Sequence, residues 1–258
     1  MTDFVLEVIN SHDLAIQTTT DVNFVLRSSG QFSDANFNTT SQYYNHAYMD
    51  ISAMNAPLVF FRPMTSSSRI AYIPGIQEHI AGANGATQKR GTVLKWYNLT
   101  IGTMQYYIFD QWVPPERSDY GIQAFDGSGN IIFDAGWNFM KVVNIKWLDP
   151  GFPNHASDPG GSNWTSVGTM GAGTLAGSMP NPRGWIYQGL GTFGIVLYES
   201  FHFDGASNEV MISLVPRGEF LDEAPATGWM HDASLSHVMA VDVSSLPTNY
   251  NSISVSAS

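Results

Sequence analysis

Apolar and polar residues alternate in short runs along the whole chain, and the spacing typical of helices is almost absent. No long stretch keeps apolar side chains at positions i, i+3, i+4 and i+7 with good helix formers between them. β-branched and aromatic residues dominate the apolar runs, which end at recurrent clusters of turn-forming residues. The pattern predicts an all-β protein with little helix, organised as β-sandwiches or partly open barrels.

The alternation predicts strands in both halves of the chain. In the first half they span residues 4–9, 14–18, 23–27, 47–52, 58–62, 69–73, 93–100 and 104–109. In the second half they span residues 120–125, 131–134, 139–147, 185–187, 193–203, 209–216 and 236–243. Segments 149–161 and 168–182 are rich in Gly and Pro and are long for loops of a compact domain. We expect these loops either to pack on a neighbouring chain or to be exposed and functional.

The best-defined motif runs from Asp119 to Ile145 and predicts a strand, a tight turn, a second strand, a turn and a third strand. The first turn is Asp126-Gly-Ser-Gly-Asn130, whose residues tolerate positive φ angles. A looser copy opens the chain at Phe4 and reaches Leu26, with turns that differ in length by one and two residues. The two copies favour a duplicated β-meander in two similar domains, because a solenoid or propeller needs more repeats. The alternative is that two unrelated hairpins share the pattern.

A Pro-containing segment between the halves is the expected domain boundary. Pro114-Pro115 cannot join a central ladder and favours an extended spacer. We therefore expect two tandem β-sandwich-like domains with long loops, residues 1–113 and 120–248, joined by a linker at residues 114–119. Residues 249–258 form a polar tail that is expected to fray.

Charge and composition disfavour several classes of function. The 258-residue chain has 22 acidic and 11 basic residues, a net charge of −11, and no run of Lys or Arg. Nucleic-acid binding needs clustered cations, so no nucleic-acid partner is expected. The lack of cysteine excludes disulfides, thiolate metal sites and cysteine nucleophiles. No secretory signal or membrane-length apolar stretch is evident, so we expect synthesis in a cytoplasm without membrane insertion.

No motif in the chain predicts catalysis or a cofactor. No nucleophile elbow or phosphate loop occurs, and the carboxylates of the second half lie in no recognisable context. The 126–130 turn has oxygen ligands at alternate positions but lacks the downstream glutamate of an EF-hand. His231, Asp232 and His237 could bind zinc together with His202, but the spacing of His231 and His237 fits neither a helix nor a strand face. We therefore expect no enzyme activity, catalytic residue, metal or cofactor.

Two tryptophans are candidates for ligand binding. Trp164 and Trp229 lie in polar, loop-like contexts, where aromatic rings can stack on sugars while Asp232 accepts hydrogen bonds from hydroxyl groups. The alternative for both is packing in the core or in a subunit interface. That packing role is the expectation for four other tryptophans, which are Trp96, Trp137, Trp147 and Trp185.

Residues Tyr120-Gly-Ile-Gln-Ala-Phe-Asp-Gly-Ser-Gly-Asn-Ile-Ile-Phe-Asp134 resemble the opening of small tail-associated proteins of tailed bacteriophages. Those proteins begin Tyr-Gly-Leu-Gln-Val-Phe, followed by a short turn of Asn, Asp, Gly or Ser and an apolar strand that ends in Asp. A strand like Met140 to Ile145 follows. In the present chain the motif lies in the middle and not at the start, which fits a tandem arrangement.

The resemblance implies a structural protein of the tail tip, baseplate or fibre that assembles with other tail proteins. It implies a location in the virion tail after synthesis in the host cytoplasm, and an oligomer such as a symmetric ring or trimer. The family supplies no catalytic residues. We expect the loops near residues 154–182 and 221–232 to face a neighbouring subunit or the host surface. The alternatives are a host-receptor or carbohydrate-binding tail protein and, less favoured, a glycan depolymerase.

Overall fold

The computed structural model confirms the all-β prediction. It describes residues 8–9, 15–17, 23–38, 44–64, 71–73, 80–81, 87–88, 90–96, 100–119, 121–149, 164–188, 194–221, 228–230 and 236–257. Within these ranges the strands form antiparallel sheets, one of which is curled into a half-barrel, and the helical content is a single 3-10 turn at Asp34–Asn36.

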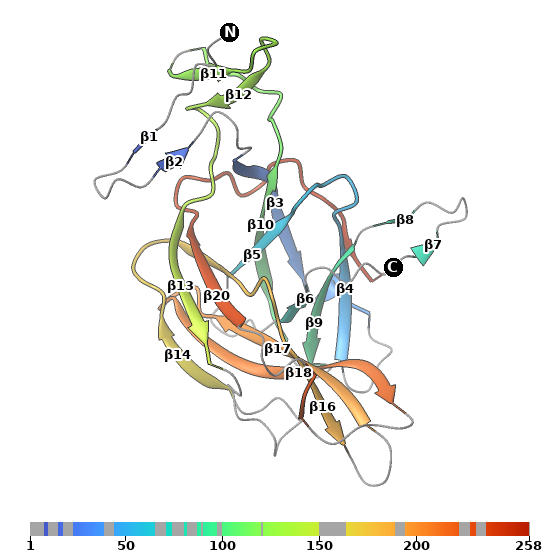
Figure 1. Cartoon of the computed structure of the whole chain (residues 1–258). Helices are drawn as coiled ribbons and strands as arrows, with labels where there is room; N and C mark the ends of the chain where they lie inside the picture. The colour runs from blue at the N-terminus through green and yellow to red at the C-terminus, as the bar shows by residue number, and fades with distance from the viewer. Residues whose placement is uncertain are drawn as a thin grey trace.

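Three larger sheets form the body of the molecule (Figure 1). The six-stranded sheet has the order β13 (Val142–Leu148), β20 (Ser236–Asp242), β15 (Leu175–Ser178), β5 (Leu58–Pro63), β10 (Thr103–Gln111) and β3 (Phe24–Ser33). The five-stranded sheet has the order β14 (Thr165–Thr169), β18 (Glu209–Leu221), β17 (Gly194–Phe203), β16 (Gly184–Gln188) and β19 (Gly228–Trp229). The four-stranded sheet has the order β21 (Val255–Ser256), β4 (Tyr44–Asp50), β9 (Arg90–Trp96) and β6 (Ala71–Ile73).

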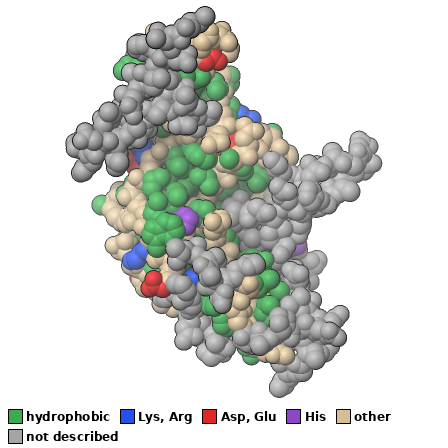
Figure 2. Space-filling view, in the orientation of Figure 1, with side chains coloured by type: hydrophobic (Ala, Val, Ile, Leu, Met, Phe, Trp, Pro, Cys, Tyr) green, Lys and Arg blue, Asp and Glu red, His purple; other side chains and the backbone are tan. Residues whose placement is uncertain are grey.

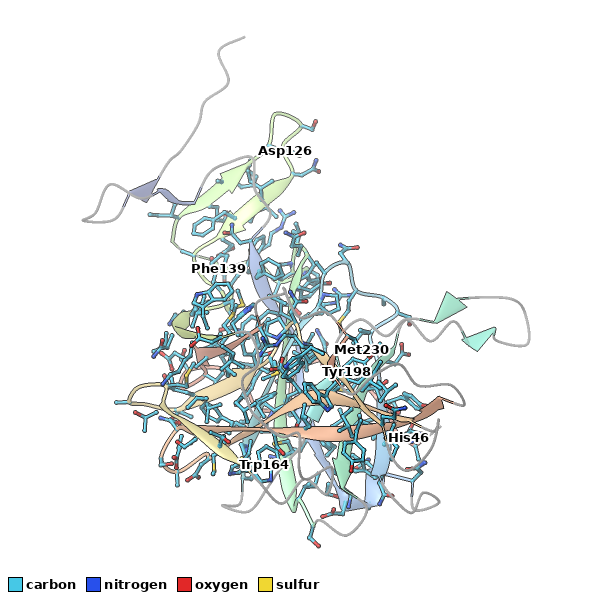
Figure 3. All side chains as sticks on the ribbon, turned by 60° about the horizontal axis from the view of Figure 1, so that its bottom comes forward. His46, Asp126, Phe139, Trp164, Tyr198 and Met230 are labelled. Atoms are coloured by element: carbon cyan, nitrogen blue, oxygen red, sulfur yellow. The ribbon has the colours of Figure 1, made fainter. Side chains whose placement is uncertain are left out.

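Three hairpins complete the described strands. They are β1 (Val8–Ile9) with β2 (Ala15–Gln17), β7 (Ile80–Ala81) with β8 (Thr87–Gln88), and β11 (Gln123–Phe125) with β12 (Ile131–Asp134). The β11–β12 hairpin was predicted from the sequence, and the 126–130 segment forms its turn. The Asp126 Oδ1 atom accepts hydrogen bonds from the backbone N–H groups of Ser128 (2.9 Å) and Asn130 (2.8 Å). Figure 3 shows Asp126 at the tip of this hairpin and Phe139 nearer the body of the molecule.

The main hydrophobic core lies between the six-stranded sheet and the other two large sheets. Strand β10 illustrates how the alternation produces it, because Met104, Tyr106 and Ile108 face this core whereas Tyr107 and Phe109 belong to a second cluster on the other side of the sheet. The main core also includes buried side chains from the other sheets, namely Ala47, Val93, Phe201, Phe203, Val210 and Ile212.

The two halves of the chain share this core, which corrects the prediction of two tandem sandwiches. Strands β3, β5 and β10 precede the predicted 114–119 linker, and β13, β15 and β20 follow it, yet all six form one sheet. The halves meet where Gly177 of β15 pairs with Phe61 of β5. The predicted linker is the connection between β10 and β11, and it does not separate two packing units.

The glycine-rich segment 168–182 is not a loop throughout, as the sequence had suggested. It contains the end of β14 and all of β15, whose four residues are buried. A side chain at Gly177 would place its Cβ atom 2.6 Å from Cδ2 of Phe203. Small residues are therefore needed in β15, because the strand packs directly against the Phe203 ring. A strand of small residues lacks the alternation of large apolar and polar side chains by which a strand is recognised in the sequence.

The segments that correspond in the predicted duplication lie side by side. Residues 23–26 match residues 138–141 in the proposed repeat, and Val25 forms an antiparallel bridge with Phe139. The Leu26 N–H donates to the Asn138 carbonyl (2.8 Å), and the Met140 N–H donates to the Phe24 carbonyl (2.9 Å). The hairpins β1–β2 and β11–β12, which precede these segments, lie at the same end of the molecule (Figure 1). This arrangement fits the duplication.

The tail at residues 249–258 is packed along its described part, which corrects the expectation that it frays. Tyr250 and Ser29 exchange two backbone hydrogen bonds, of 2.8 and 3.1 Å. The Tyr106 hydroxyl accepts a hydrogen bond from the Ile253 N–H (2.9 Å), and β21 pairs with β4. The tail thereby closes the β3 side of the six-stranded sheet.

Candidate functional site: an apolar face at the edge of β13

The two edges of the six-stranded sheet differ in whether other backbone segments cover them. The β3 edge is covered by backbone hydrogen bonds from Tyr250 and from the 138–140 segment. At the other edge, β13 pairs with β20 alone among the described strands, and it lies at the margin of the body in Figure 1. An edge strand presents unpaired N–H and C=O groups that can pair with another chain. The β13 edge is therefore available for pairing in a way that the β3 edge is not.

Large apolar side chains are concentrated on this same strand. The described part of the chain has nine exposed large hydrophobic residues, and four of them belong to β13. Their exposed fractions are 44% for Val142, 47% for Val143, 41% for Ile145 and 60% for Trp147. Edge strands of soluble proteins usually carry charged residues or proline to prevent association. The outer face of β13 carries neither, although Lys146 lies on its other side and a bulge interrupts the strand at Val143.

Cross-strand pairing places two further residues on the same face. Ile145 lies opposite Met239 and Trp147 lies opposite His237, and residues directly opposite each other share a face of the sheet. The Trp147 and His237 rings are 4.7 Å apart between centroids. We call this surface the β13 face, and it consists of Val142, Val143, Ile145, Trp147, His237 and Met239.

The other side of β13 turns inward towards its end, where Lys146 is partly buried and Leu148 is buried, whereas Asn144 is exposed. Asn144, Lys146 and Leu148 lie opposite Ala240, Val238 and Ser236. Leu148 is 3% exposed and belongs to the main core. A register shift between Val142 and Asn144 leaves Val143 as an extra residue in a β-bulge. The bulge explains why two successive valines are both exposed.

The β13 face carries no formal charge, although the chain as a whole has a net charge of −11. None of its six residues is acidic, Lys or Arg. Burial lowers the pKa of His237 below its usual value of 6.5, so this ring is neutral at pH 7. In Figure 2, hydrophobic side chains form a patch with a histidine beside it, in the position that β13 and β20 occupy in Figure 1. An uncharged, apolar patch of this kind is typical of an association surface.

The structure does not bring the predicted ligand-binding residues together. Trp164 precedes β14 and Trp229 ends β19, and these strands form the opposite edges of the five-stranded sheet. Figure 3 shows Trp164 well apart from Met230, the neighbour of Trp229. Asp232 lies outside the described residues. Both tryptophans are partly buried, and Trp164 contacts His202 edge-on with a centroid distance of 6.2 Å.

Trp229 is packed against a buried ion pair. The Arg183 guanidinium lies 4.7 Å from the centre of the Trp229 ring, and Trp185 contacts the same residue edge-on at 4.9 Å. The side chains of Arg183 and Glu199 are 2% and 0% exposed, and Nη2 of Arg183 lies 2.6 Å from Oε1 of Glu199. Because the guanidinium covers one face of Trp229, these contacts favour a packing role for this residue.

Trp147 is the exposed tryptophan that the sequence did not identify as a candidate site. The sequence predicted core or subunit-interface packing, and an exposed fraction of 60% excludes the core. A signal was available, because the apolar residues Val143, Ile145 and Trp147 alternate with the polar residues Asn144 and Lys146. Such alternation indicates a strand with one apolar face, which is covered either within the chain or by a partner.

The structure describes only part of the possible zinc site that the sequence suggested as an alternative. Among the described residues, no three His, Cys, Asp or Glu side chains form a group that could hold a metal ion. His231 and Asp232, two of the possible zinc ligands, lie outside the described residues.

The helices within the described ranges include none with the length and hydropathy of a membrane span. Comparisons with protein-family models, curated proteins and solved structures gave no match to this chain.

Proposed function

We propose that the protein is a non-enzymatic structural component of a bacteriophage tail, in the tail tip, baseplate or fibre, and that it acts by assembling with other protein chains. The observation that carries the proposal is the exposed, uncharged β13 face beside an edge with no second strand among the described residues. The resemblance of residues 120–134 to small tail-associated proteins supports the tail as the place of assembly.

The β13 strand is suited to pairing with a second copy of itself. Ile145 is the central residue of this seven-residue strand, so an antiparallel pair centred on Ile145 uses its whole length. This register places Val143 opposite Trp147 of the second copy on the outer face, and aromatic with β-branched pairs stabilise sheets. It places Asn144 opposite Lys146, whereas a pair centred on Lys146 would bring two like charges together. Pairing of identical surfaces gives a two-fold dimer.

An Ile145→Cys variant tests this arrangement directly, because the natural chain has no cysteine. In the proposed dimer the two copies of residue 145 face each other, with Cβ atoms about 4.5–5.5 Å apart, close to the separation that a disulfide spans. Mild oxidation is expected to convert the variant into a covalent dimer on a non-reducing gel. Met64, which is 53% exposed but lies outside the β13 face, provides the control variant Met64→Cys. Equal cross-linking of the two variants would contradict the register.

The tail assignment requires a separate test in purified phage particles. Antibodies against the protein are expected to label the tail in electron micrographs of the phage that encodes it. Labelling confined to the capsid, or absence of the protein from purified particles, would contradict the assignment while leaving the pairing of β13 to its own test.

Binding of a host-surface carbohydrate is the alternative proposal, and it depends on Trp164 and Trp229. Each ring is partly exposed, but described neighbours contact both of them. If this alternative holds, Trp164→Ala or Trp229→Ala abolishes binding to host polysaccharide without unfolding the protein. Unchanged binding by both variants would exclude stacking on these two rings.

A further inference from the structure

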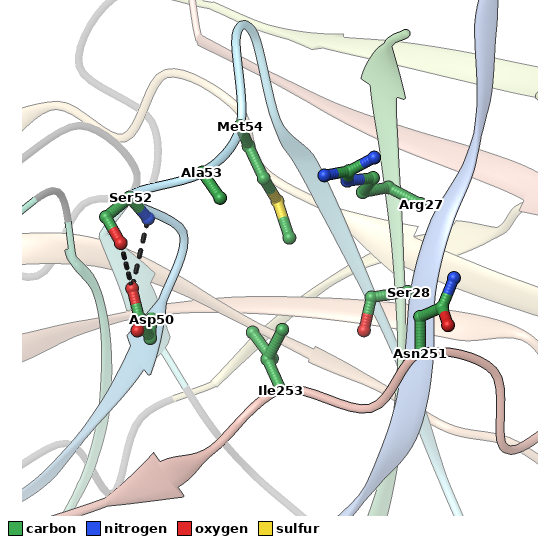
Figure 4. Close-up of a pocket in the computed structure, with 8 residues that line it drawn as sticks. All are labelled: Arg27, Ser28, Asp50, Ser52, Ala53, Met54, Asn251 and Ile253. Carbon is green, nitrogen blue, oxygen red and sulfur yellow. Dashed lines mark hydrogen bonds between the residues drawn. The ribbon is translucent and has the colours of Figure 1, made fainter. Parts of the chain in front are cut away.

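A pocket of about 260 Å³ lies between β3, the loop that follows β4, and the C-terminal segment (Figure 4). Arg27 and Ser28 contribute from β3, Asp50 and Met54 from the loop side, and Asn251 from the C-terminal segment. Its volume is slightly below the range of about 300–1,000 Å³ for pockets that hold drug-sized ligands. The pocket therefore suits a smaller molecule, and it is separate from the β13 face.

A β-bulge makes Arg27 and Ser28 line the same pocket. Ile108 pairs with Ser28 and Phe109 pairs with Leu26, so Arg27 is an extra residue in β3. In a regular strand, neighbouring side chains point to opposite faces, whereas a bulge can direct both to one side. Bulges often occur beside functional sites for this reason.

Both side chains have hydrogen-bonding capacity that the described part of the chain leaves unused. Ser28 is 1% exposed, and its Oγ atom has no hydrogen-bond partner there. No hydrogen bond or ion pair joins the Arg27 guanidinium to another described residue. Its Cζ atom lies 4.0 Å from the centre of the Trp112 ring, which holds the guanidinium plane and leaves its N–H groups available. A buried hydroxyl without a protein partner can bind a water molecule or an oxygen atom of a ligand.

Hydrogen bonds outside the pocket fix its walls. The Asp110 carboxylate accepts from the N–H groups of Asn55 (3.1 Å) and Ala56 (2.7 Å), which holds the loop that carries Met54. On the opposite wall, the Tyr106 hydroxyl accepts from the Ile253 N–H at 2.9 Å. A site whose walls are fixed in advance loses little conformational entropy when a ligand binds.

Asn251 in the same wall adopts a left-handed backbone conformation, with a φ of 44°. Among residues other than glycine, asparagine is one that tolerates this conformation. Its side-chain amide can both donate and accept hydrogen bonds. The pocket thus combines a guanidinium, a hydroxyl and an amide along one side.

The Asp50 carboxylate limits the charge of a ligand. Its Oδ1 atom accepts hydrogen bonds from the backbone N–H (3.1 Å) and the hydroxyl (2.5 Å) of Ser52, as Figure 4 shows. The other oxygen can accept a hydrogen bond from a ligand hydroxyl. The lining holds one cation and one anion, so a ligand carboxylate fits at Arg27 and away from Asp50, and there is no second cation for another carboxylate.

We propose that this pocket binds a small monocarboxylic acid that carries hydroxyl groups, of about the size of one sugar acid. The carboxylate of the ligand pairs with the Arg27 guanidinium, whose planar N–H groups match a carboxylate. Ser28 and Asn251 form hydrogen bonds with its oxygen atoms, and Asp50 accepts a hydrogen bond from a hydroxyl. Met54 and Ile253 contact its carbon skeleton.

Titration of the full-length protein with D-glucuronate tests the proposal. D-glucose is the control that lacks the carboxylate, and acetate is the control that lacks the hydroxyl groups. Ligand-observed NMR and calorimetry are expected to show saturable binding of glucuronate and binding of each control at least about tenfold weaker, because a hydrogen bond to a charged group contributes enough for that factor. Arg27→Gln is expected to weaken glucuronate binding by about tenfold or more. The exposed Arg117 lies outside the lining, so Arg117→Gln is the matched control and leaves binding unchanged.

Ser28→Ala separates ligand binding from folding. It removes a hydroxyl that has no described partner, so the melting temperature is expected to stay level or rise, while glucuronate binding weakens by a factor of about three to ten. If Arg27→Gln fails to fold, Ser28→Ala decides the test. Lack of saturable glucuronate binding, or equal binding by the wild type and Ser28→Ala, overturns the proposal. Neither result affects the pairing of β13, because the two surfaces share no residue.

Discussion

Aspartates that accept backbone N–H groups fix several loops of this sparsely charged chain. The Asp134 carboxylate accepts hydrogen bonds from Ser118, Gln123 and Gly136, and it is fully buried. Asp110 holds the 55–56 segment in the same manner. These acids therefore have structural partners within the described residues.

Asp134 is expected to make stability depend on pH in the acid range. Hydrogen bonds, first that from the Ser118 side chain, lower the pKa of Asp134 from its usual 3.8 to about 2 in the folded protein. Because the folded pKa is the lower one, the carboxylate stabilises the fold above pH 3.8, and this contribution is lost as the pH falls towards 2. Melting temperatures between pH 5 and pH 2 should fall less steeply for Asp134→Asn than for the wild type. Parallel curves would contradict this role.

Gly177 is expected to tolerate no side chain. A Cβ atom at this position would lie 2.6 Å from Phe203, so Gly177→Ala should lower the free energy of unfolding by about 1–3 kcal/mol through overpacking. A Cβ atom at Gly127, in the β11–β12 turn, would have no neighbour within 4 Å, so Gly127→Ala should stay within about 1 kcal/mol of the wild type. Urea denaturation measures both values. Equal effects would show that β15 is not packed as described.

At the scale of elements, alternation in the sequence predicted most of the described strands. It identified β5, β10, β12 and β17 to within a few residues, because apolar side chains on these strands bury against neighbouring sheets. It missed β15, whose small residues pack against the aromatic ring of Phe203. These residues do not alternate between large apolar and polar side chains. The sequence signal therefore failed where close packing requires glycine.

The candidate site was harder to predict than the strand that carries it. The sequence predicted a strand at residues 139–147, but an edge position depends on pairing with β20, which lies far along the chain. Alternation places Trp147 on the apolar face of the strand, but it does not show whether that face is covered within the chain, so exposure of Trp147 could not be inferred. Trp164 and Trp229 were candidates because polar residues flank them, whereas their rings contact His202, Trp185 and Arg183.

At the scale of the whole molecule, the two halves are expected to depend on each other for folding. Strands from both sides of residues 114–119 share one sheet and one core. Residues 1–113 and residues 114–258, expressed separately, should therefore lack cooperative thermal unfolding, because each would expose the core surface that the other covers. Circular dichroism melts of each fragment measure this. A cooperative transition in either fragment alone would support the two-domain prediction instead.

Assembly through the β13 face is the central claim, and the mass of the protein in solution tests it most directly. Light scattering on the wild type should give a dimer or a larger assembly built from dimers. Trp147→Glu places a charge at the most exposed apolar position of the face and should shift the protein towards the monomer, whereas Met64→Glu, at another exposed apolar site, should leave the mass unchanged. A monomeric wild type, or a mass unaffected by Trp147→Glu, would contradict the claim.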